Sequence, residues 1–157
     1  MDNNDILRRL RFILDLSDDA MIDTYGKGGE SVSRAEISDW LKKEEDEAFD
    51  AVVDENLAVF LNGLIVNFRG KKEGETPVAE MELNNNITLR KLKIAFSLDA
   101  EQVAFLMKLG GQNVSTAELG SFSRNASHTK YKPCNDQYLR ALLKGLQEQR
   151  RGKKMKK

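Results

Sequence analysis

One helix-start motif occurs twice in this chain, as Val32-Ser33-Arg34-Ala35-Glu36 and, 82 positions later, as Val114-Ser115-Thr116-Ala117-Glu118. Each copy contains the Ser-x-x-Glu pattern of a capping box, in which the serine and glutamate side chains satisfy backbone donors at a helix N-terminus. With the same offset and no gap, residues 3–70 align with residues 85–152, and 19 of the 68 aligned positions are identical. We therefore predict an internal duplication.

Each copy predicts about four helices and no strand, so the expected fold class is all-α with two tandem, roughly four-helix domains. In the first copy, apolar residues recur at helical spacing over 6–14, 21–25, 37–41 and 57–65. Asn4 or Asp5 is the expected N-cap of the first helix. Asp54 and its counterpart Asp136 are the expected N-caps of the fourth helices.

The duplication sets the predicted domain boundaries. The first repeat spans residues 1–70, a linker with Gly74, Pro77 and four glutamates spans 71–84, the second repeat spans 85–152, and a basic tail spans 153–157. A copy of this size is marginal as an independent core, so we expect the copies to pack together. Gly63 and Gly145 lie inside the fourth helices, where glycine costs about 1 kcal/mol relative to alanine. This cost predicts that another helix approaches closely there.

The repeated pattern resembles the YehS-like family, which comprises small bacterial proteins built from two copies of a helical domain of unknown function. The resemblance rests on a set of segments distributed over almost the whole chain. They are Asn4-Asp5-Ile6-Leu7-Arg8-Arg9-Leu10-Arg11, Trp40-Leu41-Lys42-Lys43-Glu44-Glu45-Asp46-Glu47, Phe60-Leu61-Asn62-Gly63-Leu64-Ile65, Asn84-Asn85-Asn86-Ile87 and Leu89-Arg90-Lys91-Leu92-Lys93-Ile94-Ala95-Phe96-Ser97-Leu98. The resemblance implies the duplicated helical fold and a bacterial cytosolic setting, and it implies no catalytic or binding residue.

Composition excludes several classes of protein. The 157 residues include one cysteine, Cys134, and one histidine, His128, which excludes an intrachain disulfide framework and most histidine-based metal sites. The N-terminus lacks the basic region of a secretory signal, and no apolar run approaches the roughly 20 residues of a membrane span. The expected location is therefore cytoplasmic, with no membrane association.

Net charge is zero over the whole chain but not over its halves. Residues 3–70 contain 8 Lys/Arg and 15 Asp/Glu, which gives −7, whereas residues 85–152 contain 11 and 5, which gives +6. Such asymmetry bears on partners rather than on fold. It predicts that an anionic partner binds the second copy, and that chains can associate through their acidic and basic repeats.

No acid/base, nucleophile or metal constellation occurs in both copies, so we expect no enzyme, cofactor or metal. Cys134, His128 and Asp136 form a group with nucleophilic potential. Cys134, however, aligns with the apolar Val52.

The leading hypothesis is a non-enzymatic module that binds an unidentified protein or nucleic acid. The expected binding residues are the basic sets of the two first helices and a cluster in the second copy. They are Arg8, Arg9, Arg11, Arg90, Lys91, Lys93, Arg124, Lys130 and Lys132. The alternative is nucleic-acid binding through a helix-turn-helix-like element, because a short helix precedes the capping-box helix and basic residues follow it in the second copy.

Overall fold

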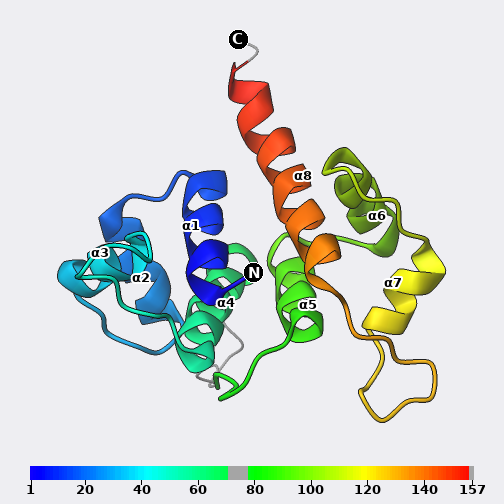
Figure 1. The fold of residues 1–157 in the computed structure, drawn as a ribbon, viewed down its shortest axis with the longest axis horizontal. Coiled ribbons are helices and arrows are strands. Elements are labelled where there is room, and N and C mark those ends of the chain that lie inside the picture. The colour runs from blue at the N-terminus through cyan, green and yellow to red at the C-terminus, as the bar shows by residue number, and fades with distance from the viewer. Residues whose placement is uncertain (71–77, 156–157) are drawn as a thin grey trace. The chain divides into compact units, whose positions relative to one another are not determined.

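The computed structural model describes residues 1–70 and 78–155, with side chains up to residue 152. Every regular element in these ranges is a helix, and the helices fall into two compact units, Met1–Leu83 and Asn84–Lys157. Unit 1 holds α1 (Asn3–Leu14), α2 (Asp18–Lys27), α3 (Arg34–Leu41) and α4 (Asp54–Arg69). Unit 2 holds α5 (Asn85–Ala95), α6 (Ala100–Leu109), α7 (Thr116–Phe122) and α8 (Asp136–Met155) (Figure 1). The predicted all-α class and the duplicated four-helix organisation are confirmed.

Serine caps begin α3 and α7 as predicted, but only the first forms a complete capping box. Ser33 Oγ accepts a hydrogen bond from Glu36 N (3.1 Å), and the Glu36 carboxylate accepts one from Ser33 N (3.0 Å). Ser115 Oγ accepts from Glu118 N (3.0 Å). The Glu118 carboxylate instead accepts from the Tyr138 hydroxyl (2.7 Å). This acid therefore joins α7 to α8.

The predicted caps of the other helices are wrong in detail. Asp2 caps α1, because its Oδ1 accepts from Asp5 N (2.8 Å), and Asn4 is used elsewhere. Asp54 is the first residue of α4 rather than its cap, and it accepts from Asn3 Nδ2 (2.7 Å).

Unit 2 repeats this arrangement at the start of α8. Asp136 is the first helical residue and accepts from Asn85 Nδ2 (2.7 Å). Asn135 takes the capping role, since its Oδ1 accepts from Tyr138 N (3.2 Å). In both units the aspartate therefore fastens the last helix to the start of the first.

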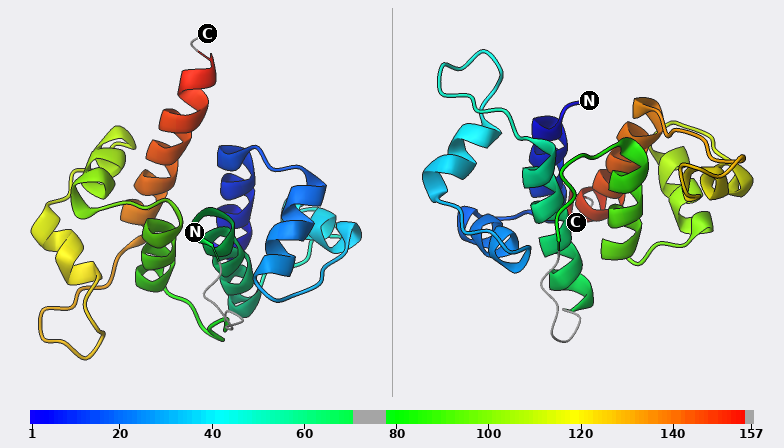
Figure 2. Two further views of the ribbon diagram at one scale, coloured as in Figure 1. Left: turned by 180° about the vertical axis from the view of Figure 1, so that it is seen from behind. Right: turned by 90° about the horizontal axis from the view of Figure 1, so that it is seen from below.

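In each unit the last helix crosses the second helix at a glycine, as predicted. A Cβ atom at Gly63 of α4 would lie 1.9 Å from the Thr24 carbonyl oxygen of α2. A Cβ atom at Gly145 of α8 would lie 1.9 Å from the Leu106 carbonyl oxygen of α6. The close approach is mutual. Gly28, which follows α2, lies against the backbone of α4, and Gly110, which follows α6, lies against the backbone of α8. Figure 2 shows the pairs α2–α4 and α6–α8 that these crossings hold together.

Aromatic side chains fill the core of unit 1. Tyr25 is fully buried, and its ring centroid lies 5.3 Å from that of Trp40 and 5.2 Å from that of Phe60. The Tyr25 hydroxyl donates to Asn56 Oδ1 (2.7 Å), which satisfies its polar end inside the core.

Part of the predicted linker packs on unit 1. Residues 71–77 lie outside the described residues. After them, the chain returns along α4, because Asn62 Nδ2 donates to the Val78 carbonyl oxygen (3.4 Å) and Leu83 N donates to Asp54 Oδ2 (2.8 Å).

At the other end, the helical backbone of α8 continues to Met155, into the predicted basic tail, and residues 156–157 lie outside the described residues. No helix in the described part of the chain combines the length and apolarity needed to cross a membrane. Packing of the two copies against each other stays a prediction.

Candidate functional site

An open cleft of about 620 Å³ lies between the end of α1 and the end of α3 in unit 1. Three cationic side chains line it, those of Arg8, Arg11 and Lys42. Apolar side chains complete the lining, those of Phe12, Leu16 and Leu41. Two members of the predicted first-helix set thus meet a third cation, Lys42, which is not among the predicted binding residues. Its alignment with Arg124 was the available signal.

A buried asparagine holds the two sides of this cleft together. Asn4 is 2% exposed, and its Nδ2 donates to the carbonyl oxygens of Trp40 (2.9 Å) and Asp50 (2.9 Å). Its Oδ1 accepts from Val52 N (3.0 Å). One amide therefore fastens the end of α3 and the end of loop 42–50 to α1.

This clamp places Lys42 beside the arginines of α1. Arg8 lies one turn beyond Asn4 and Arg11 almost two turns beyond it, on the same side of the helix. Arg8 Nη1 donates to the Lys42 carbonyl oxygen (3.0 Å), which confirms that the two elements are in contact.

Each cation of the cleft is paired with an aspartate of its own unit. Arg8 pairs with Asp5, Arg11 Nη1 lies 2.6 Å from Asp18 Oδ1, and Lys42 Nζ lies 2.7 Å from Asp39 Oδ1. The positive charge of the cleft is therefore balanced inside unit 1.

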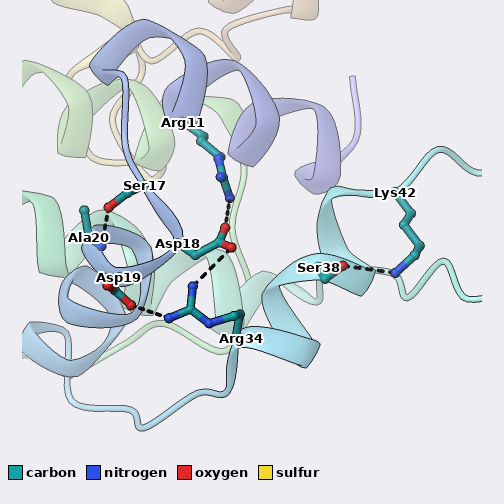
Figure 3. Close-up of polar contacts among 8 residues, drawn as sticks. All are labelled: Arg11, Ser17, Asp18, Asp19, Ala20, Arg34, Ser38 and Lys42. Carbon is teal, nitrogen blue, oxygen red and sulfur yellow. Dashed lines mark hydrogen bonds and ion pairs between the residues drawn. The ribbon is translucent and has the colours of Figure 1, made fainter.

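Asp18 is the centre of a charged network that joins three helices (Figure 3). Its second oxygen lies 3.3 Å from Arg34 Nη1, and Arg34 also pairs with Asp19. Hydrogen bonds from Arg11 and then Arg34 hold the pKa of the Asp18 carboxyl below its usual range. The network ties α1, α2 and α3 by charge, in addition to the Asn4 clamp.

Unit 2 retains the cations at these positions and replaces all three aspartates. Arg90, Lys93 and Arg124 stand where unit 1 has Arg8, Arg11 and Lys42. The aspartate positions are occupied by Ile87, Ala100 and Ser121. Arg90 and Arg124 are exposed and form no ion pair with the described residues, while Lys93 Nζ donates to Ser123 Oγ (3.3 Å).

The asparagine clamp is repeated in unit 2 with nearly the same distances. Asn86 Nδ2 donates to the carbonyl oxygens of Phe122 (3.0 Å) and Lys132 (2.8 Å), and its Oδ1 accepts from Cys134 N (2.8 Å). Both ends of loop 124–132 are therefore fastened at the start of α5. We call the exposed and half-buried cations around this junction the basic surface of unit 2. It consists of Arg90, Lys93, Arg124, Lys130 and Lys132.

The two loops beside the clamps share a backbone conformation but differ in charge. In loop 42–50, backbone hydrogen bonds join Asp46 N to Lys43 O (3.0 Å) and Asp50 N to Asp39 O (3.2 Å). In loop 124–132, the equivalent bonds join His128 N to Asn125 O (2.9 Å) and Lys132 N to Ser121 O (3.2 Å). Two lysines and five carboxylates give loop 42–50 a net charge of −3, and one arginine and two lysines without any acid give loop 124–132 a charge of +3.

Two residues of the predicted basic sets do not belong to these sites. Arg9 is half-buried and does not line the cleft, and its counterpart Lys91 is only 9% exposed. Arg9 follows Arg8 and Lys91 follows Arg90, and a step of one residue turns each side chain about 100° around the helix. That Arg9 and Lys91 bind a partner stays a prediction, and they lie outside the cleft and the basic surface of unit 2.

The nucleophile candidate is a core residue. Cys134 is 4% exposed at the position that Val52 fills in unit 1, and burial raises the pKa of its thiol to about 12. His128 instead accepts a hydrogen bond at Nδ1 from Lys130 N (3.0 Å), inside the loop. The thiol is therefore protonated at neutral pH and unsuited to nucleophilic attack.

Fold and site together define a duplicated four-helix protein whose first unit has a cleft of cations paired with aspartates, and whose second unit keeps the equivalent cations without those aspartates. The chain belongs to the family described as protein of unknown function (DUF1456), whose profile matches residues 3–70 and 85–152. The Uncharacterized protein YehS of Escherichia coli (strain K12) is 38% identical over 154 residues, which cover 97% of this chain and 98% of the relative. The predicted YehS-like resemblance is thereby confirmed. No solved structure shows a significant match.

Proposed function

We propose that this protein is a noncatalytic, cytoplasmic binding protein, and that the basic surface of unit 2 docks an acidic segment of another protein. One observation carries the proposal. In unit 1, the equivalent cations Arg8, Arg11 and Lys42 each hold an aspartate carboxylate. Unit 2 has the cations without these aspartates, so carboxylates of a partner can occupy the same places.

The affinity of such a complex is limited because its charged side chains are exposed to water. Single exposed ion pairs contribute roughly 0–1 kcal/mol, so several must act together. Ile94, one turn beyond Arg90 on α5, is 44% exposed and offers apolar contact beside the charges. We expect dissociation constants of roughly micromolar to millimolar, with strong dependence on salt.

Nucleic-acid binding is the second candidate, favoured by the five cations of the basic surface of unit 2. A sequence-reading helix-turn-helix has less support, because α7 is only seven residues long. Its exposed residues include Thr116, Ala117 and Gly120, which lack the long hydrogen-bonding side chains that read base edges. Nucleic-acid contacts made by the basic surface of unit 2 would therefore involve phosphates and would not discriminate between sequences.

The decisive test restores the missing aspartates. A fluorescent ten-residue peptide of alternating glutamate and serine is titrated with the full chain in 50 mM NaCl. The double variant Ala100→Asp/Ser121→Asp copies Asp18 and Asp39 into unit 2, and we expect it to bind at least tenfold more weakly than the wild type.

The matched control is Arg140→Gln/Lys144→Gln, which removes two exposed cations of α8 outside the basic surface of unit 2. It should bind the peptide almost as well as the wild type. Equal affinity of the wild type and the aspartate variant would contradict the proposal. Failure to bind the peptide, together with binding of DNA of any sequence that weakens steeply with salt, would favour the second candidate.

A further inference from the structure

We propose that the acidic segment docked by the basic surface of unit 2 is loop 42–50 of a second copy of this chain, so that copies join head to tail. The inference rests on the function proposed above and names its partner.

The charges of the two loops are complementary. Loop 42–50 has a net charge of −3 and loop 124–132 a charge of +3. On the acidic side, three exposed glutamates form no bond with the described residues, namely Glu44, Glu45 and Glu47. On the basic side, three exposed side chains likewise form no ion pair or hydrogen bond with the described residues, namely Arg124, Lys130 and Lys132. Each loop thus presents charges that no described residue of its own unit compensates.

Both loops are held in shape before any partner arrives. Asp46 Oδ1 accepts from Ala48 N (2.9 Å), and at the equivalent position His128 Nδ1 accepts from Lys130 N (3.0 Å). The Asn4 and Asn86 clamps fix the ends of the loops. Preformed loops lose little conformational entropy on binding, which favours association through few ion pairs.

The contact is heterologous, because it joins two different surfaces of the same chain. Each copy that binds through its basic loop still offers its acidic loop to another copy. Such contacts build open chains, or rings where the geometry closes. Assembly should therefore grow with concentration rather than stop at a two-fold dimer.

Two neutralised variants test this in the full chain. One is Glu44→Gln/Glu45→Gln/Glu47→Gln, which lacks an acidic loop, and the other is Arg124→Gln/Lys130→Gln/Lys132→Gln, which lacks a basic loop. Each alone should remain monomeric by sedimentation velocity in 50 mM NaCl. An equimolar mixture should form a 1:1 complex that does not grow, because each partner retains a single competent loop.

The wild type should form larger species as its concentration rises, and its association constant should fall at least tenfold when NaCl is raised to 500 mM. Arg140→Gln/Lys144→Gln should assemble like the wild type. A wild type that stays monomeric at every concentration would overturn the inference, as would a neutralised variant that still assembles alone or a mixture without a complex.

The peptide titration separates the two proposals. One outcome is that the wild type binds the peptide, the aspartate variant binds it more weakly, and the wild type stays monomeric. In that case the proposed docking of an acidic segment stands and self-assembly is wrong. If the wild type neither binds the peptide nor assembles, both proposals are wrong.

Discussion

Loops 42–50 and 124–132 occupy the same place in their units and carry opposite charges. Their backbone hydrogen bonds are equivalent, and the asparagine that fastens each loop to the first helix makes the same three bonds. What differs is the side chains that face water. Fold and surface charge are therefore specified by separate sets of residues in this molecule.

The aspartates of unit 1 show how the difference affects the site. Asp18 and Asp39 lie on the cations of the cleft, while their counterparts Ala100 and Ser121 carry no charge. The same framework thus holds one balanced cleft and one surface whose cations form no ion pair with the described residues. Four predictions test whether framework and charge are independent.

The largest effect should come from the helix crossings, which both units share. Gly63→Ala and Gly145→Ala place a Cβ atom 1.9 Å from a carbonyl oxygen, so each should destabilise its unit by about 3 kcal/mol in urea denaturation. Gly26→Ala and Gly120→Ala meet no atom within 4 Å and should be neutral or stabilising by up to about 1 kcal/mol. A crossing variant no less stable than its control would show that the helices do not approach so closely.

The asparagine clamps should be nearly as important, and equally so in both units. Asn4→Ala and Asn86→Ala each leave three backbone groups without their partner, which should cost about 2 kcal/mol. Amide hydrogen exchange at Val52 and Cys134 assigns the loss to a unit. The exposed Asn113→Ala serves as the control. A clear difference between the two clamp variants would mean that loop charge contributes to the clamp.

A smaller effect should follow from converting the cleft of unit 1 to the unit 2 type. Asp18→Ala/Asp39→Ser removes two of the three aspartates that balance the cations, so isothermal titration with the acidic peptide should detect a second, weaker site. Loop 42–50 repels the peptide and keeps this site weaker than that of unit 2. Asp23→Ala, whose partner Lys27 lies outside the cleft, should leave the stoichiometry at one. An unchanged stoichiometry in the double variant would break the proposed relation between aspartates and docking.

The smallest effect should be the pH dependence of the Asp18 network. Because the folded-state pKa of Asp18 is lowered, its contribution to stability is present above the ordinary carboxyl pKa of about 4 and is lost as pH falls through the lowered value. The difference in melting temperature between the wild type and Asp18→Asn should therefore shrink as pH falls from 7 towards 3. The exposed pair is screened by water, so the difference is small at every pH. A difference that grows in acid would contradict the assignment.

Local patterns predicted much of this fold. Spacing and composition near each residue were enough to predict the duplication, the all-α fold class, the Ser33 cap and the glycine crossings. The role of Asn4 was missed because its three partners lie 36, 46 and 48 residues away, and a polar residue at a helix start is typical of a cap.

The site was predicted in part for a related reason. Charge counts directed attention to the basic residues of unit 2 but could not separate Arg90 from Lys91, because the face of a helix that is covered depends on its neighbours. The pairing of Arg11 with Asp18 was accessible in principle. Aligning the copies shows that the cations persist while all three aspartates change, but the partners of those aspartates became clear only from the structure.

The backbone contacts at Gly63 and Gly145 also bear on how a duplicated gene can diverge. Because main-chain atoms make the closest approach, the crossing depends on the absence of a side chain and hardly on the identity of outward-facing residues. Mutations that change surface charge can therefore accumulate one at a time without passing through an unfolded intermediate. An ancestral pair of identical copies could have acquired opposite charges in small steps, each of them a stable protein.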